Sequence, residues 1–94
     1  MTYEVLVEVR LRPGIADPQG ATIERALPAL GFSGVDHVSV GKAFRLSIDA
    51  PDEPEAHRRA VEMADRLLAN PVIEVSTVTV TGVVEPVPVR TGVR

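Results

Sequence analysis

The sequence predicts a two-layer α+β sandwich, with two helices on one face of a mainly antiparallel sheet. Alternating apolar residues near the N-terminus predict a half-buried strand. Two later segments carry helix caps followed by apolar residues at helical spacing. Runs of β-branched residues flank the second of these helices. The element order is therefore βαββαβ, or βαβαβ if the middle β region is one long bent strand.

The first strand is expected over residues 3–11. Its odd-numbered residues are apolar, whereas the other face carries Glu4, Glu8 and Arg10 together with Leu6. This mixed face is either solvated or one side of a sheet-to-sheet interface.

The first helix is expected to begin with Asp17 as its N-cap and Pro18 at the first helical position. Gly31 fits the left-handed position just after the helix, where a Schellman arrangement would bring Phe32 back towards the last turn. Pro28 should kink or tighten that turn, because it removes a backbone hydrogen bond.

The middle β region is expected from Val35 to Asp49. Its apolar residues fall on even positions on both sides of Gly41 and Lys42. A two-residue hairpin loop would move Phe44 to the opposite face, so the pattern favours either a three-residue loop at 41–43 or one strand bent at Gly41.

The second helix is expected to begin at a capping box formed by Asp52 and Glu55. On its outer face, Glu55 with Arg59 and Glu62 with Arg66 are spaced for favourable i,i+4 ion pairs. The inward stripe is expected to contain Ala56, Ala60, Val61, Ala64, Leu67 and Leu68.

Asn70 and Pro71 should end this helix, because asparagine leaves helical geometry cheaply and proline cannot extend the hydrogen-bond ladder. The last strand is expected from Val72, with a bulge near residues 76–77 where the apolar parity changes. The domain is expected to end at residue 82, and residues 83–94 are expected to form a mobile tail.

Composition limits the function classes. Ninety-four residues with only three aromatic side chains predict one domain with a modest aliphatic core, so we expect a homodimer or a dimer of dimers. A net charge of −3 argues against nucleic-acid and anionic-membrane partners. No apolar run approaches the ~20 residues that span a bilayer, no signal peptide is visible and cysteine is absent. A cytoplasmic location is the simplest interpretation.

No group of residues has the spacing of a catalytic or cofactor site. His37 and His57 lack a paired nucleophile or further ligands, so we expect two surface histidines. The glycines match neither a P-loop nor a dinucleotide-binding turn. We expect this chain to contain no catalytic residue, metal site or bound cofactor.

Three blocks of sequence stand in an order and spacing typical of one family. They are Asp17-Pro18-Gln19-Gly20, then Val38-Ser39-Val40-Gly41-Lys42 leading into Leu46-Ser47-Ile48, and last Leu67-Leu68-Ala69-Asn70-Pro71-Val72-Ile73-Glu74. In these blocks the chain resembles the PurS family, the small subunit of phosphoribosylformylglycinamidine synthase. The resemblance covers residues 3–80, and it departs from the family at Pro28 and after Gly82.

The resemblance implies a role in de novo purine biosynthesis. The complete enzyme is a ligase that uses ATP and glutamine to convert formylglycinamide ribonucleotide to formylglycinamidine ribonucleotide. A glutaminase subunit releases ammonia, and a large synthetase subunit binds ATP and makes the amidine. The resemblance implies that the dimeric small subunit bridges these two partners and helps ammonia pass between them.

The three blocks also supply candidates for the partner interface. They are Asp17, Pro18, Gln19, Gly20, Gly41, Lys42, Asn70, Pro71, Val72, Ile73 and Glu74. Gln19, Lys42 and Glu74 have no evident duty in the fold, so we expect them to contact a partner subunit or to line the ammonia route. The alternative function is a stand-alone, ferredoxin-like regulatory domain that binds a small ligand.

Overall fold

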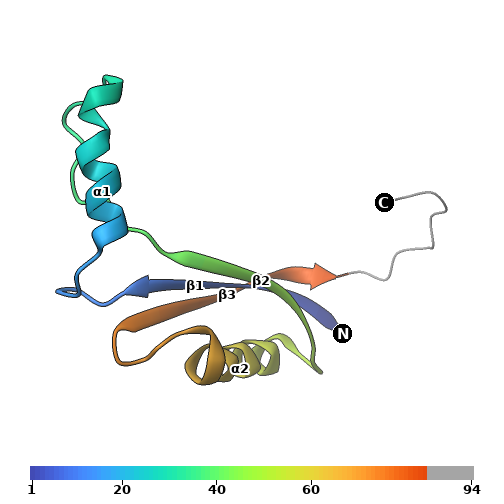
Figure 1. Cartoon of the computed structure of the whole chain (residues 1–94). Coiled ribbons are helices and arrows are strands. Elements are labelled where there is room, and N and C mark those ends of the chain that lie inside the picture. Colours follow the sequence, from blue (N-terminus) through green and yellow to red (C-terminus); the bar gives the residue numbers. More distant parts are fainter. Residues whose placement is uncertain (85–94) are drawn as a thin grey trace, which may run out of the picture.

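The protein is described by a computed structural model over residues 1–84. These residues form a three-stranded antiparallel sheet with one helix on its face and another beyond its end (Figure 1). The elements are β1 (Thr2–Leu11), α1 (Pro18–Ala26), β2 (Lys42–Asp49), α2 (Glu53–Met63) and β3 (Glu74–Val84). The central strand is β1, with β2 and β3 on either side. The α+β class with an antiparallel sheet is confirmed.

The core lies between the sheet and α2. Ala56, Ala60 and Ala64 recur every four residues on the inner face of the helix and are fully buried. Their small side chains let the helix backbone approach the sheet closely. Within residues 1–84, the buried apolar residues are Tyr3, Val5, Val7, Val9, Ile48, Ala50, Ala56, Ala60 and Ala64. As the composition predicts, this core is almost entirely aliphatic.

The first helix stands beyond the end of the sheet where β1 finishes (Figure 1). Gly20 is its only buried residue, and the apolar side chain of Ile23 is exposed. The expectation that both helices lie on one face is therefore met by α2 and not by α1. The physical reason is that the carboxylates of Asp17 and Glu24 attach α1 to residues 38–40, rather than an apolar stripe attaching it to the sheet.

The two ends of α1 follow the sequence pattern. Pro28 tightens the last turn into a short 3-10 segment, η1 (Pro28–Leu30). Gly31 adopts a positive φ of 94°. The Gly31 N–H donates to the Pro28 carbonyl, and the Phe32 N–H donates to the Leu27 carbonyl, at 3.0 and 3.1 Å. This pair of hydrogen bonds is the expected Schellman motif.

The middle β region is shorter than expected. The strand β2 begins at Lys42, and residues 35–41 have no regular structure. Neither a hairpin loop at 41–43 nor a long strand bent at Gly41 is present. The N–H groups of Val38 and Val40 donate to side chains of the α1 region instead of to a neighbouring strand.

The end of α2 differs from a regular helix. It passes into a π-helical segment, η2 (Ala64–Leu68), closed by a hydrogen bond from the Ala69 N–H to the Ala64 carbonyl. This wider turn moves the residues after it around the helix axis. Leu68 is half-buried, whereas Leu67 is 83% exposed. The prediction that Leu67 belongs to the inward stripe is therefore wrong.

The outer face of α2 carries the expected ion pairs. Arg59 Nε lies 2.8 Å from the Glu55 carboxylate, and Arg66 Nη1 lies 3.3 Å from that of Glu62. Arg58 joins the same network, with its guanidinium 2.7 Å from Glu55.

The last strand also differs in detail. Residues 71–73 form a turn, so β3 begins at Glu74 and not at Val72. Its register shifts opposite Glu4 and Val5, which places the bulge at Thr81 instead of residues 76–77. The strand continues to Val84, and residues 85–94 of the expected tail lie outside the described residues.

Candidate functional site

A groove of about 360 Å³ lies at the end of the sheet where β1 finishes. It is built from the end of β1, the start of α1, the approach to β2 and the first residue of β3. We call it the end groove, and its lining residues are Val9, Arg10, Leu11, Asp17, Pro18, Gln19, Val40, Gly41, Lys42 and Glu74. The fold thus brings candidate residues from all three sequence blocks to one place.

Asp17 builds one wall of the end groove. Its Oδ1 accepts a hydrogen bond from the Gly20 N–H and its Oδ2 accepts one from the Val40 N–H, both at 2.9 Å. These two bonds stabilise the ionised form, so the pKa of the Asp17 carboxyl lies below its ordinary value. One carboxylate therefore caps α1 and also fastens it to the segment that leads into β2.

Two glycines allow the segments of this wall to approach each other. A Cβ added at Gly20 would lie 2.5 Å from the carbonyl oxygen of Val38. A Cβ added at Gly41 would lie 2.6 Å from the carbonyl oxygen of Val9. Close backbone contact, and not a bend in a long strand, is therefore the reason for glycine at position 41.

The 70–74 turn reaches the end groove through Glu74. The Glu74 Oε1 accepts a hydrogen bond from the Asn70 N–H at 2.7 Å, and the Asn70 Oδ1 accepts one from the Val72 N–H at 3.1 Å. The N–H groups of Ile73 and Glu74 both donate to the Asn70 carbonyl. The side chain of Glu74 therefore closes the turn, which corrects the expectation that it has no duty in the fold.

Gln19 and Lys42 differ from Glu74. Both are exposed, and neither side chain forms a hydrogen bond or an ion pair with another residue in the range 1–84. The Lys42 Nζ lies 5.8 Å from the centre of the Phe44 ring, a cation–π contact that directs the lysine without neutralising its charge. An amide and an ammonium group are thus available at the end groove.

The other candidates lie close to the groove without lining it. Gly20 is buried behind Asp17, whereas Asn70, Pro71 and Val72 are exposed on the turn next to Glu74. Ile73 is half-buried in the same turn.

Sequence reasoning missed Arg12. Its Nε and Nη2 both donate to the Pro71 carbonyl, at 3.1 and 2.8 Å, and its backbone N–H donates to the Ile73 carbonyl at 2.8 Å. In the sequence, Arg12 simply follows the strand that is expected over residues 3–11. Its partners are 59 residues away for the side chain, so no local pattern could identify them.

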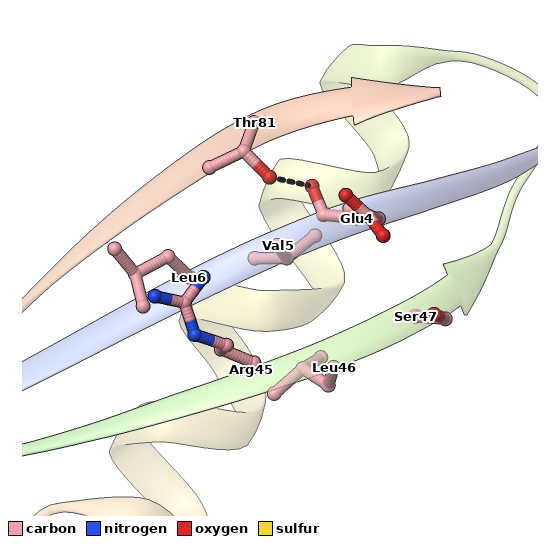
Figure 2. Close-up of a pocket in the computed structure, with 7 residues that line it drawn as sticks. All are labelled: Glu4, Val5, Leu6, Arg45, Leu46, Ser47 and Thr81. Carbon is pink, nitrogen blue, oxygen red and sulfur yellow. Dashed lines mark hydrogen bonds between the residues drawn. The ribbon is translucent and has the colours of Figure 1, made fainter. Parts of the chain in front are cut away.

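A second hollow of about 230 Å³ lies on the face of the sheet opposite α2. Figure 2 shows Leu6 of β1 beside Arg45 of β2, and Glu4 beside Thr81 of β3, whose hydroxyl donates to the Glu4 carbonyl at 3.3 Å. Side chains of both charges surround Leu6 here. This is the mixed face that the alternation in the first strand predicts.

The described residues offer little else for chemistry. His37 and His57 are exposed, as expected for surface histidines. No group of three metal-binding side chains occurs within residues 1–84. In the same range, no helix is both long enough and apolar enough to span a membrane.

Comparison with known proteins points to one family. The family model PurS, described as phosphoribosylformylglycinamidine (FGAM) synthase, matches residues 4–82. The phosphoribosylformylglycinamidine synthase subunit PurS of Archaeoglobus fulgidus is 47% identical over 68 residues, which cover 72% of this chain and 85% of the relative. That of Synechocystis is 42% identical over 73 residues, covering 78% of this chain and 73% of the relative.

Solved structures agree with the sequence matches. Methanocaldococcus jannaschii PurS, one of the subunits of formylglycinamide ribonucleotide amidotransferase in the purine biosynthetic pathway, superposes with a TM-score of 0.77 at 35% identity. The match covers 88% of this chain and 99% of that one. A chain in the structure of PurLQS from Thermotoga maritima has a TM-score of 0.79 at 29% identity, covering 85% of this chain and 98% of its own length.

Proposed function

The chain belongs to the PurS family, and we propose that it bridges the glutaminase and synthetase subunits of phosphoribosylformylglycinamidine synthase and assists ammonia transfer between them. The reaction converts formylglycinamide ribonucleotide to formylglycinamidine ribonucleotide in the cytoplasm. In this proposal, glutamine and ATP are bound and used by the partner subunits. This chain supplies contacts and no catalytic group.

The end groove carries this proposal. It joins three segments that are far apart in sequence. Asp17 fastens the start of α1 to Val40, and Glu74 closes the 70–74 turn. Gln19 and Lys42 also line this groove. Their polar groups form no hydrogen bond or ion pair with another side chain or backbone group in the range 1–84. A fixed surface that displays polar groups suits subunit contact, because little conformational freedom is lost on binding.

We also propose that the working form is a homodimer or a dimer of dimers. Four large apolar side chains on and after α1 are substantially exposed: Ile23 at 41%, Leu30 at 69%, Phe32 at 57% and Val35 at 44%. Exposed apolar side chains grouped on one projecting segment are typical of an interaction surface. Sedimentation equilibrium should show an oligomer at micromolar concentration, and a folded monomer would contradict this.

Reconstitution from three separately purified proteins tests the bridging role. Synthetase and glutaminase subunits of the same organism are mixed with and without this chain, and amidine formation is measured with glutamine or with ammonium as the nitrogen source. We expect glutamine-dependent activity to require the chain, and ammonium-dependent activity to depend on it much less. Equal dependence with both nitrogen sources would argue against a role in ammonia transfer. No dependence with either source would argue against the whole proposal.

A further inference from the structure

The outer edge of β3 differs from that of β2. Within residues 1–84 the sheet ends at these two strands, so one edge of each has no neighbouring strand. β2 carries Lys42, Arg45 and Asp49, and charged side chains protect an edge strand from pairing with another chain. β3 contains no charged residue after Glu74 and no proline. The edge of β3 therefore lacks two common protections against pairing.

A hollow of about 450 Å³ lies between α2 and β3. No residue of β1 lines it, so it opens at the outer edge of β3. Along one flank of α2 it is lined by His57, Val61 and Asp65, which recur at intervals of four residues, and β3 contributes Val78. Val61 follows the apolar stripe of the helix, yet it is 37% exposed. This flank of α2 thus has an apolar centre between a histidine and a carboxylate.

We propose that a second copy of this chain pairs with the outer edge of β3, antiparallel and about a twofold axis at Val78. The inference rests on the proposed oligomer. A dimer of dimers needs two different twofold interfaces, and the exposed apolar residues on and after α1 supply one of them. The edge of β3 supplies the other, and two three-stranded sheets then join into one continuous sheet with both α2 helices on the same face.

The strand is self-complementary about Val78. Antiparallel pairing about this residue places Thr77 opposite Thr79 on the open face of the sheet, and Val78 opposite its own copy on the face that α2 covers. Threonine pairs and pairs of β-branched apolar residues are favourable when they lie directly opposite each other. The pairing needs only residues 76–80, so the bulge at Thr81 lies outside it.

The flank of α2 is self-complementary about the same axis. Neighbouring strands lie about 4.8 Å apart and α2 packs mainly against β1 and β3, so the two helices would lie about 10 Å apart, a normal packing distance. Because the helices are antiparallel, Val61 meets its own copy and His57 lies opposite Asp65 of the second copy. A histidine donates a hydrogen bond to a carboxylate whether or not it is protonated. This complementarity selects a second copy as the occupant.

Disulfide mapping on the full chain tests the strand pairing, because the chain contains no cysteine. Thr77→Cys and Thr79→Cys, mixed so that subunits exchange, should cross-link between chains under mild oxidation, because opposite Cα atoms lie about 4.5–5.5 Å apart. Either variant alone should give at least about fivefold less cross-linked product, since its cysteines are diagonal neighbours about 7–8 Å apart. Ser47→Cys, on β2 and exposed on the same open face, is the matched control and should not cross-link with Thr79→Cys.

A charge exchange tests the helix contact independently. His57→Asp should raise the dissociation constant of this contact about tenfold, because it sets two carboxylates opposite each other. The double variant His57→Asp, Asp65→Lys should return the constant to within about twofold of the native value. Positions 57 and 65 are eight residues apart and are not neighbours within one helix, so recovery must arise between copies. Sedimentation equilibrium gives the constants, and thermal unfolding of each variant controls for folding.

The outcomes separate this inference from the proposals on which it rests. Cross-linking of Thr79→Cys with Ser47→Cys would show that open faces meet, and would overturn the inference. An oligomer without cross-links between Thr77→Cys and Thr79→Cys would also overturn it, while leaving the proposed oligomer intact; any other occupant of the edge gives this result. A monomeric native chain would refute both. The bridging role is judged separately, by the reconstitution with glutamine and ammonium.

Discussion

Replacement of Gly20 by alanine tests whether close contact fixes the base of α1. In an ordinary helix this change stabilises the protein by about 0.5–1 kcal/mol, because alanine loses less backbone freedom on folding. Here the new Cβ would lie 2.5 Å from the Val38 carbonyl oxygen and 2.8 Å from the Asp17 Oδ2. Both atoms belong to the segments that the Asp17 carboxylate ties together, so neither is a flexible tip that can swing away.

The size of the effect follows from these two opposing contributions. Forcing an extra carbon into a packed contact typically destabilises a protein by about 1–3 kcal/mol. Subtracting the helix preference leaves a net destabilisation of about 1 kcal/mol, opposite in sign to the usual effect of this substitution in a helix. In a domain of this size, that corresponds to a fall in melting temperature of about 4–8 °C if α1 unfolds together with the core.

Two measurements are needed, because α1 lies outside the core and can open separately. Thermal unfolding reports on the whole domain, and amide exchange at Gly20 and Val40 reports on the Asp17 bonds themselves. Gly82→Ala is the control, since a Cβ there has open space around it, and its effect should lie within about 0.5 kcal/mol. A Gly20→Ala protein that is as stable as the native chain, with unchanged exchange at Val40, would refute the reasoning.

Three other predictions concern single side chains. Gln19→Ala and Lys42→Ala should each change stability by less than about 0.5 kcal/mol and lower glutamine-dependent activity more than ammonium-dependent activity; activity losses that simply track melting temperature would show a structural role. Glu74→Ala should cost about 1 kcal/mol in thermal unfolding because the Asn70 N–H loses its acceptor, whereas Glu74→Gln, which keeps an acceptor, should recover most of it. Hydrogen bonds from two arginines lower the pKa of Glu55 to about 2, so the folded state binds fewer protons than the unfolded state and this contribution is lost as pH falls from about 4.5 towards 2. Acid titrations of stability should therefore show Glu55→Gln less stable than the native chain at pH 7 and converging with it near pH 2, while a gap independent of pH would contradict the assignment.

The sequence determined those features that depend on neighbours along the chain. Asp17 caps α1 through the N–H three residues later, and Asp52 does the same for α2. Pro28 tightens a turn and Gly31 follows it with a positive φ. These are contacts within one helical turn, so residue type and spacing suffice to predict them. The resemblance of three blocks to one family was likewise visible in the sequence, and the family is confirmed.

Only the three-dimensional structure decided where these elements lie and which side chains hold them in place. The second oxygen of Asp17 reaches Val40, 23 residues away, and this contact helps to hold α1 off the end of the sheet. The roles of Arg12 and Glu74 in holding the 70–74 turn are visible only in the folded chain. Leu67 follows the apolar period of α2, yet a π-helical turn exposes it. In each case the deciding partner is a backbone group, and a sequence pattern records side chains. The partners of Asp17 and Arg12 also lie 23 and 59 residues away, so those two contacts exist only once the chain has closed on itself.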